Sequence, residues 1–146
     1  MAKPIQLETN VFVAPQLREA DFEEIAAMGF RSVVDNRPDG EADDQLPHHA
    51  ARRAAEQHGL AFRYAPVRNF DINEDEPVEA FAAALEELPG PILFYCRSGT
   101  RCTLLWAQAS VGRLGLAETT RIAAAAGFDL APIRDTLEER LGLLAA

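Results

Sequence analysis

Residues 92–102 read ILFYCRSGTRC, and residues 103–109 continue as TLLWAQA. Four apolar residues after Pro89-Gly90-Pro91 predict a short buried strand, and a helix that is apolar nearly all round follows a small polar loop. A strand, a loop and a helix in this order place unpaired backbone N–H groups at the positive end of a helix dipole, where anions bind. We therefore expect residues 96–102, which we call the anion loop, to hold an anion beside Cys96.

Strand and helix patterns alternate along the rest of the chain. Strands are predicted at 10–14, 31–35 and 61–65, and helices at 19–28, 47–58, 77–88, 118–126 and 132–144. This alternation predicts an α/β fold with a central, mostly parallel sheet flanked by helices, in one domain over residues 1–146. Since ligands bind at the carboxyl ends of such strands, segments 35–37, 68–75 and 96–101 should gather at one mouth.

Composition narrows the classes of partner. The formal net charge of −9 argues against nucleic acid and anionic membranes, and no apolar run is long enough to span a bilayer. The two cysteines, Cys96 and Cys102, form no disulfide framework and fit a reducing cytoplasm. We expect a small anionic or phosphorylated substrate, drawn by local positive groups. The sequence gives no indication of oligomeric state.

Cys96 is the predicted nucleophile. The field that would hold an anion also stabilises a thiolate, which lowers the pKa of the thiol below its usual value of about 8.5. The planar fork of Arg101 suits two oxygens of a tetrahedral anion. The alternatives are a small buried core residue at Cys96 and a surface ion pair at Arg101. The residues predicted to surround the anion are Arg97, Ser98, Gly99, Thr100, Arg101 and Cys102.

The pattern of a Cys, a small Gly-containing loop and an Arg resembles the signature of the protein tyrosine phosphatase superfamily. Together with VVDNRPDGE at 33–41 and LWA at 105–107, it is similar to the bacterial beta-lactamase hydrolase-like, phosphatase-like domain family, over roughly residues 10–137. The resemblance implies a dual-specificity-phosphatase-like fold. It also implies hydrolysis of a phosphomonoester through a phosphocysteine at Cys96.

The loop departs from the phosphatase pattern. Four residues lie between Cys96 and Arg101, where tyrosine phosphatases have five, and the usual His before the nucleophile is Tyr95. A Cys-Arg-x-Gly-x-Arg loop is what rhodanese sulfurtransferases carry. The second hypothesis is therefore sulfur transfer through a Cys96 persulfide, and the third is a non-catalytic module that binds an anion or a partner.

A phosphatase needs an acid to protonate the leaving alcohol. The resemblance places that acid on the loop before the preceding helix, which makes Asp71 the predicted acid and Asp75 the next choice. The alternative for each is a solvated loop carboxylate or a helix cap. The sulfurtransferase hypothesis needs no acid.

Cys102 has two interpretations of equal weight. It could resolve an oxidised Cys96 by forming a disulfide, or it could be a small packed residue at the start of the helix. His48, His49 and His58 share one predicted helix without a matching set of ligands, so they are expected at the surface. We predict neither a metal nor a cofactor.

Overall fold

The computed structural model describes residues 1–145, with side chains for residues 1–142. Five strands form one sheet in the order β1-β2-β5-β3-β4. They are β1 (Ile5–Glu8), β2 (Val11–Ala14), β3 (Ser32–Asp35), β4 (Ala61–Tyr64) and β5 (Ile92–Tyr95). Strand β1 is antiparallel to β2, and all other neighbours are parallel. The predicted α/β fold with a mostly parallel sheet is confirmed.

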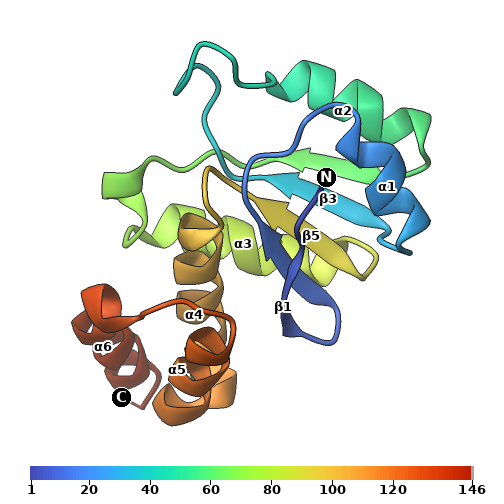
Figure 1. The fold of residues 1–146 in the computed structure, drawn as a ribbon. Coiled ribbons are helices and arrows are strands. Elements are labelled where there is room, and N and C mark those ends of the chain that lie inside the picture. Colours follow the sequence, from blue (N-terminus) through green and yellow to red (C-terminus); the bar gives the residue numbers. More distant parts are fainter. Residues whose placement is uncertain (146) are drawn as a thin grey trace.

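Helices cover both faces of the sheet (Figure 1). Helices α1 and α2 lie on one face, and α3 to α6 lie on the other. The α-helices are α1 (Asp21–Ala27), α2 (His48–Gln57), α3 (Asp75–Glu87), α4 (Thr100–Leu114), α5 (Leu116–Ala125) and α6 (Arg134–Ala145), and two 3-10 helices are η1 (Asn69–Asp71) and η2 (Ala131–Ile133).

Strand β5 is apolar at every position because it lies at the centre of the sheet, with helices on both sides. Leu93 and Tyr95 belong to the core under α1 and α2. Phe94 points the other way and stacks on Phe81 of α3, with ring centroids 4.0 Å apart. Trp106 of α4 is fully buried in the same core. The alternation along β5 thus directs Cys96 towards α4.

The sequence missed one strand and placed several helix starts two or three residues away from their observed positions, among them those of α3 and α4. Strand β1 was not predicted, because only Leu7 of its four residues is buried and an edge strand of this kind carries almost no pattern. Helix α3 begins at Asp75, so Pro77 is its third residue and not its first. Helix α4 begins at Thr100, so its first turn forms the second half of the anion loop.

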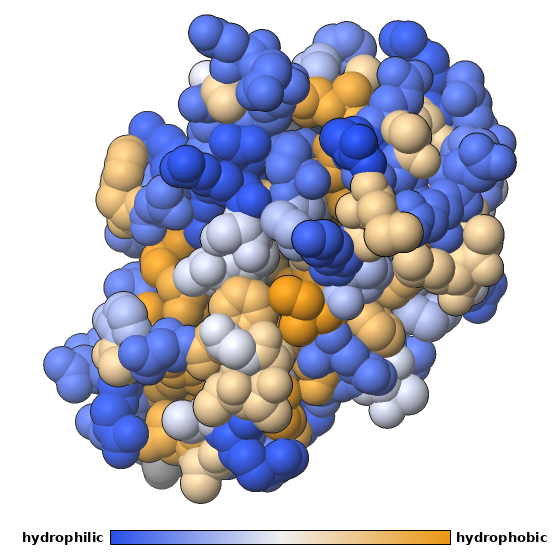
Figure 2. All heavy atoms as spheres, in the orientation of Figure 1, coloured by the Kyte–Doolittle hydropathy of each residue, from blue (hydrophilic) through white to orange (hydrophobic). Residues whose placement is uncertain are grey.

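The surface differs between the two halves of the molecule. Figure 2 shows mostly hydrophilic atoms over the upper part, where the 36–47 loop and α2 lie, and more apolar atoms over the region of α5 and α6. Among the described residues, the large apolar side chains that stay exposed are Met1, Met28 and Phe70. Within residues 1–145, no helix is both long and apolar enough to cross a membrane.

Candidate active site

The anion loop leaves β5 between the ends of two neighbouring parallel strands. The N–H of Cys96 donates to the carbonyl of Ala14 at the end of β2, at 3.3 Å. The N–H of Asn36, just past β3, donates to the carbonyl of Tyr95 at 2.9 Å. These bonds fix the start of the loop at the carboxyl edge of the sheet, where the parallel topology predicted a site.

The loop folds back over the sulfur of Cys96. Gly99, directly before α4, has φ +89°, a left-handed conformation that side chains with a Cβ rarely adopt. This conformation aims the Gly99 N–H at Cys96 Sγ, with 3.1 Å between nitrogen and sulfur. The Cys96 residue is only 1% exposed. The sulfur therefore lies inside the loop.

Hydrogen bonds lower the pKa of Cys96 to about 6. The largest contribution is a hydrogen bond with the Cys102 side chain. Burial opposes it, and the backbone N–H groups of Cys102, Ser98 and Gly99 add to the lowering. We expected backbone N–H groups to stabilise the Cys96 thiolate. We did not expect the thiol of Cys102 to be its main hydrogen-bond partner. At neutral pH Cys96 is mostly a thiolate.

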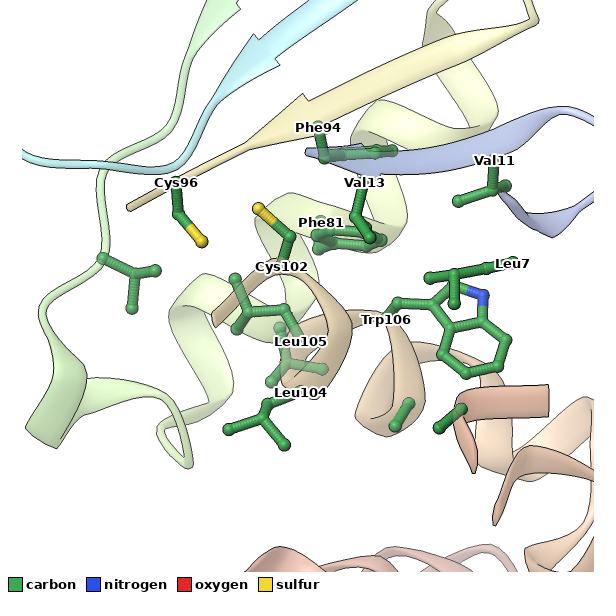
Figure 3. Packing of buried hydrophobic residues seen from close by; sticks show 14 of the residues in the cluster. Leu7, Val11, Val13, Phe81, Phe94, Cys96, Cys102, Leu104, Leu105 and Trp106 are labelled. Carbon is green, nitrogen blue, oxygen red and sulfur yellow. The ribbon is translucent and has the colours of Figure 1, made fainter. Parts of the chain in front are cut away.

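The pKa of Cys102 is shifted in the opposite direction, above its ordinary value. Its side chain is completely buried on the first turn of α4, and Figure 3 shows the two sulfur atoms pointing into the same space between β5 and α4. Burial raises the pKa of Cys102, and the nearby Cys96 raises it further. Both cysteines are free. The pair is thus a thiolate beside a thiol.

Arg101 is the second residue of α4, within the anion loop, and is 4% exposed. Its Nη1 and Nη2 donate to the two carboxylate oxygens of Glu41, each at 2.8 Å, and Nη1 also donates to the carbonyl of Val67 at 3.0 Å. Burial disfavours the charged guanidinium, but Glu41 and the Cys96 thiolate raise the pKa of Arg101 above its ordinary value. The ion pair that we weighed at the surface is present, with Arg101 buried and Glu41 partly exposed to water.

Glu41 is the site residue that the sequence analysis missed. Its Oε1 also accepts a hydrogen bond from Arg37 Nε at 2.9 Å, and Arg37 Nη1 donates to Gln16 at 3.0 Å. The hydrogen bonds from Arg101 make the largest contribution and lower the pKa of Glu41. Burial raises this pKa, and the hydrogen bond from Arg37 lowers it further. Glu41 belongs to the quoted 33–41 motif, but the pairing with Arg101 depends on the order of the strands, which the motif does not encode.

The remaining loop residues mostly face outward. Arg97, Ser98 and Thr100 are exposed, and Ser98 Oγ donates to Thr100 Oγ1 at 3.0 Å. The backbone N–H of Ser98 contributes to the interior of the loop as a hydrogen-bond donor to Cys96. The Thr100 N–H instead donates to Ser98 Oγ at 3.4 Å. The structure thus brings Cys96, Gly99, Arg101 and Cys102 together around one point.

The two predicted acids, Asp71 and Asp75, line a cavity beside the anion loop and do not belong to the loop itself. Asp71 ends η1, and its Oδ2 accepts a hydrogen bond from Arg68 Nε at 2.9 Å. Asp75 begins α3, is 82% exposed at its side chain and pairs with Arg140 at 3.1 Å. Both carboxylates line a cavity of about 1090 Å³ that runs along β4 and α3. Neither contacts Cys96 in this conformation.

A further acidic group lies under the 36–47 loop. Asp35, the last residue of β3, is 1% exposed, and its Oδ1 accepts the Arg37 N–H at 2.8 Å. Burial raises the pKa of Asp35 to about 7, against the lowering by that hydrogen bond. Asp35 therefore titrates near neutral pH, on the segment that carries Glu41.

The three histidines form no ligand set. His48 is half-buried: its ring stacks on Tyr64 at 3.9 Å, and its Nδ1 lies 2.5 Å from Asp39 Oδ2. His49 and His58 are exposed. Within residues 1–145, no group of three or more His, Cys, Asp and Glu side chains could hold a metal ion.

The sheet order and the strand–loop–helix around Cys96 define the class of tyrosine-phosphatase-like α/β proteins. The chain belongs to the family described as "Beta-lactamase hydrolase-like protein, phosphatase-like domain", which it matches over residues 5–113. It is 34% identical over 130 residues to a beta-lactamase hydrolase-like protein of Xylella fastidiosa (strain Temecula1), and 30% identical over 140 residues to one of Agrobacterium fabrum. Those matches cover 88% and 94% of this chain but only 30% and 32% of the relatives.

Solved structures agree with this class. A candidate phosphatase from Neisseria meningitidis z2491 is 35% identical, with a TM-score of 0.83 over 93% of this chain and 96% of that chain. Kinase associated phosphatase shares the fold alone, at 16% identity and a TM-score of 0.71 over 100% of this chain and 96% of that chain.

Proposed function

We propose that this chain is a cysteine-dependent phosphatase that hydrolyses a phosphomonoester through a phosphocysteine at Cys96. One observation carries the proposal: a buried thiolate lies among backbone N–H groups with a fixed guanidinium beside it. A thiolate can attack phosphorus, and the same N–H groups stabilise the charge that develops on the equatorial oxygens. Water then hydrolyses the phosphocysteine.

The orientation of Arg101 supports this role. Glu41 and Val67 take three of the five guanidinium hydrogens, two on Nη1 and one on Nη2. The hydrogens that remain, on Nε and Nη2, lie along one edge of the plane and form a fork that fits two oxygens of a phosphoryl group. Glu41 therefore holds the far edge of Arg101 without using the edge that an anion needs.

We propose Asp71 as the acid that protonates the leaving alcohol. It lies on the segment after β4, which ends at the same edge of the sheet as the anion loop. It would have to exchange Arg68 for the leaving oxygen when the substrate binds. Asp75 is the second choice, since it pairs with Arg140 and points into solvent.

The experiment compares two phosphomonoesters, one with an alkyl alcohol and one with an activated aryl leaving group. Cys96→Ser should abolish turnover of both. Asp71→Asn should slow the alkyl ester about 100-fold and leave the aryl ester nearly unchanged, because only the poor leaving group needs a proton. Equal loss on both esters would show that Asp71 is not the acid. Turnover that survives Cys96→Ser would refute the proposed nucleophile.

Rhodanese-like sulfur transfer is the second candidate function. The observation that favours it is the four-residue spacing between Cys96 and Arg101, which makes the loop shorter than a phosphatase loop. A thiosulfate-to-cyanide assay run beside the phosphatase assay separates the two. Turnover of thiosulfate alone would replace the phosphatase proposal. Turnover of neither substrate would favour the binding module.

A further inference from the structure

Arg37 reaches across the end of the strand that carries Cys96. Arg37 follows β3, and its Nη1 donates at 3.0 Å to Oε1 of Gln16, which follows β2. Strand β5 lies between β2 and β3 in the sheet. The guanidinium of Arg37 therefore spans the carboxyl end of β5, where the anion loop begins.

Hydrogen bonds connect Arg37 to both ends of the anion loop. On one side, the Gln16 N–H donates to the carbonyl of Arg97 at 3.2 Å. On the other side, Arg37 Nε donates to Oε1 of Glu41 at 2.9 Å, and the same oxygen accepts from Arg101 Nη2 at 2.8 Å. Because one oxygen binds both guanidinium groups, Arg37 Nε lies within two hydrogen-bond lengths of Arg101 Nη2, which belongs to the edge left free for an anion.

Three N–H groups of the Arg37 guanidinium are available to a ligand. Glu41 and Gln16 take two of the five, and within residues 1–142 the other three have no partner. The residue is only 6% exposed, yet Nη2, which carries two of these N–H groups, is not among the unpaired polar atoms that are sealed from water. A buried guanidinium with unpaired but accessible N–H groups is typical of an anion site, because leaving such donors without a partner costs free energy.

The charges around the loop also call for a second cation. Arg37 and Arg101 share the single carboxylate of Glu41, whereas Asp35 accepts the backbone N–H of Arg37 and not its guanidinium. A bound dianion adds two negative charges beside the Cys96 thiolate, and Arg101 cannot offset them alone while it is paired with Glu41. The anion loop is also one residue shorter than a phosphatase loop, so it offers one backbone N–H fewer. A guanidinium N–H can take the place of that donor.

We propose that Arg37 is a second anion-binding residue, whose guanidinium contacts a tetrahedral dianion held by the anion loop and Arg101. The ligand class is a phosphate-like dianion, either free or as the phosphoryl group of a monoester. This inference rests on the anion site of the proposed function, but it requires binding only. The test therefore measures binding and not turnover.

The experiment follows how inorganic phosphate protects Cys96 from iodoacetamide. The full chain is alkylated at slightly alkaline pH, where phosphate is mostly a dianion, and the rate as a function of phosphate concentration gives Kd. Arg37→Gln should raise Kd at least about 10-fold, because a charge-assisted hydrogen bond is lost. Arg37→Lys should raise it no more than about 3-fold, since the ammonium keeps the charge. Arg53→Gln, at an exposed position of α2, removes the same charge and should leave Kd unchanged.

A comparison of Lys with Gln separates direct binding from bracing. An ammonium cannot connect Gln16 to Glu41 as the planar guanidinium does, so a purely structural role predicts the same loss in Arg37→Lys and Arg37→Gln. Equal loss in these two variants would overturn the proposal. An unchanged Kd in Arg37→Gln, or no protection of the unaltered chain by phosphate, would overturn it as well.

The unaltered chain gives a second test that needs no variant to fold. Sulfate should protect Cys96 at a concentration about 10-fold lower than perchlorate, a tetrahedral monoanion, at matched ionic strength. Equal protection by the two anions would contradict a site with two guanidinium groups. Failure of the proposed function is seen separately, as a chain that binds phosphate through Arg37 but hydrolyses no phosphomonoester.

Discussion

The carboxylate of Glu41 lies against the end of the Arg101 guanidinium, so that Oε1 faces Nη2 and Oε2 faces Nη1, each at 2.8 Å. The two residues are 60 positions apart in the chain. They meet because β3 and β5 are parallel neighbours, and each residue follows the carboxyl end of its strand. Such a two-point contact fixes both the position and the plane of the guanidinium before any substrate arrives.

Glu41→Gln should therefore impair both stability and activity. The substitution leaves the buried Arg101 charge with a neutral partner, which costs about 1–2 kcal/mol in the free energy of unfolding because Glu41 is partly exposed to water. The free edge of Arg101 also loses its orientation, so we expect kcat/KM for a phosphomonoester to fall at least about 10-fold. Chemical denaturation and steady-state kinetics measure the two effects. Glu118→Gln is the matched control, because Glu118 pairs with Arg121 in an exposed position and should matter little.

Gly99→Ala tests the backbone of the anion loop. An alanine at position 99 would have to adopt φ +89°. Its Cβ would lie 3.4 Å from the Phe128 ring and 3.6 Å from the backbone of Ala14. We expect a loss of about 1–2 kcal/mol of stability and a rise in the pKa of Cys96, because the N–H that contacts the sulfur must shift. Gly59→Ala is the control, since Gly59 has φ +74° with nothing within 4 Å of its Cβ position. Because the contacts at Gly99 are ordinary van der Waals distances and both glycines have a positive φ, the two variants should lose similar stability, and only Gly99→Ala should change the titration of Cys96. An unchanged Cys96 titration in Gly99→Ala would mean that the position of the Gly99 N–H has no influence on the sulfur.

The sequence predicts what is local and misses what the order of strands creates. The strand before Cys96, the anion loop and the following helix are consecutive in the chain, so apolar pattern and turn residues suffice to predict them. The partner of Arg101 depends on β3 lying beside β5, and no pattern around Glu41 records that neighbour. Cys102 was recognised, but its hydrogen bond with Cys96 depends on how the first turn of α4 packs under β5.

Asp35 should make the stability of the protein depend on pH near neutrality. Its pKa is raised from the usual acidic range to about 7 in the folded state, so the folded protein binds this proton more tightly than the unfolded chain. The protonated Asp35 carboxyl contributes its full share to the free energy of unfolding below about pH 4, and this contribution is lost as the pH rises through about 7. Asp35→Asn keeps an oxygen acceptor for the Arg37 N–H and removes the titration.

The stability of Asp35→Asn relative to the unaltered chain should therefore rise with pH between about 4 and 8, by no more than about 4 kcal/mol. Urea denaturation of both proteins across this range gives the difference, in which the other titrating groups cancel. A constant difference would mean that Asp35 is ionised throughout, with an ordinary pKa.

The last prediction concerns the thiolate at the centre of the site. Iodoacetamide reacts with thiolates and not with thiols, so the rate of Cys96 alkylation should follow a titration curve with a midpoint at about pH 6. Because the Cys102 side chain is the largest source of the lowered pKa, Cys102→Ala should move that midpoint up by at least about one pH unit. Cys102→Ser should move it less, since a hydroxyl can still donate to the sulfur. If Cys102→Ala leaves the midpoint at about 6, the backbone N–H groups alone hold the Cys96 charge, and the thiol of Cys102 is not needed for it.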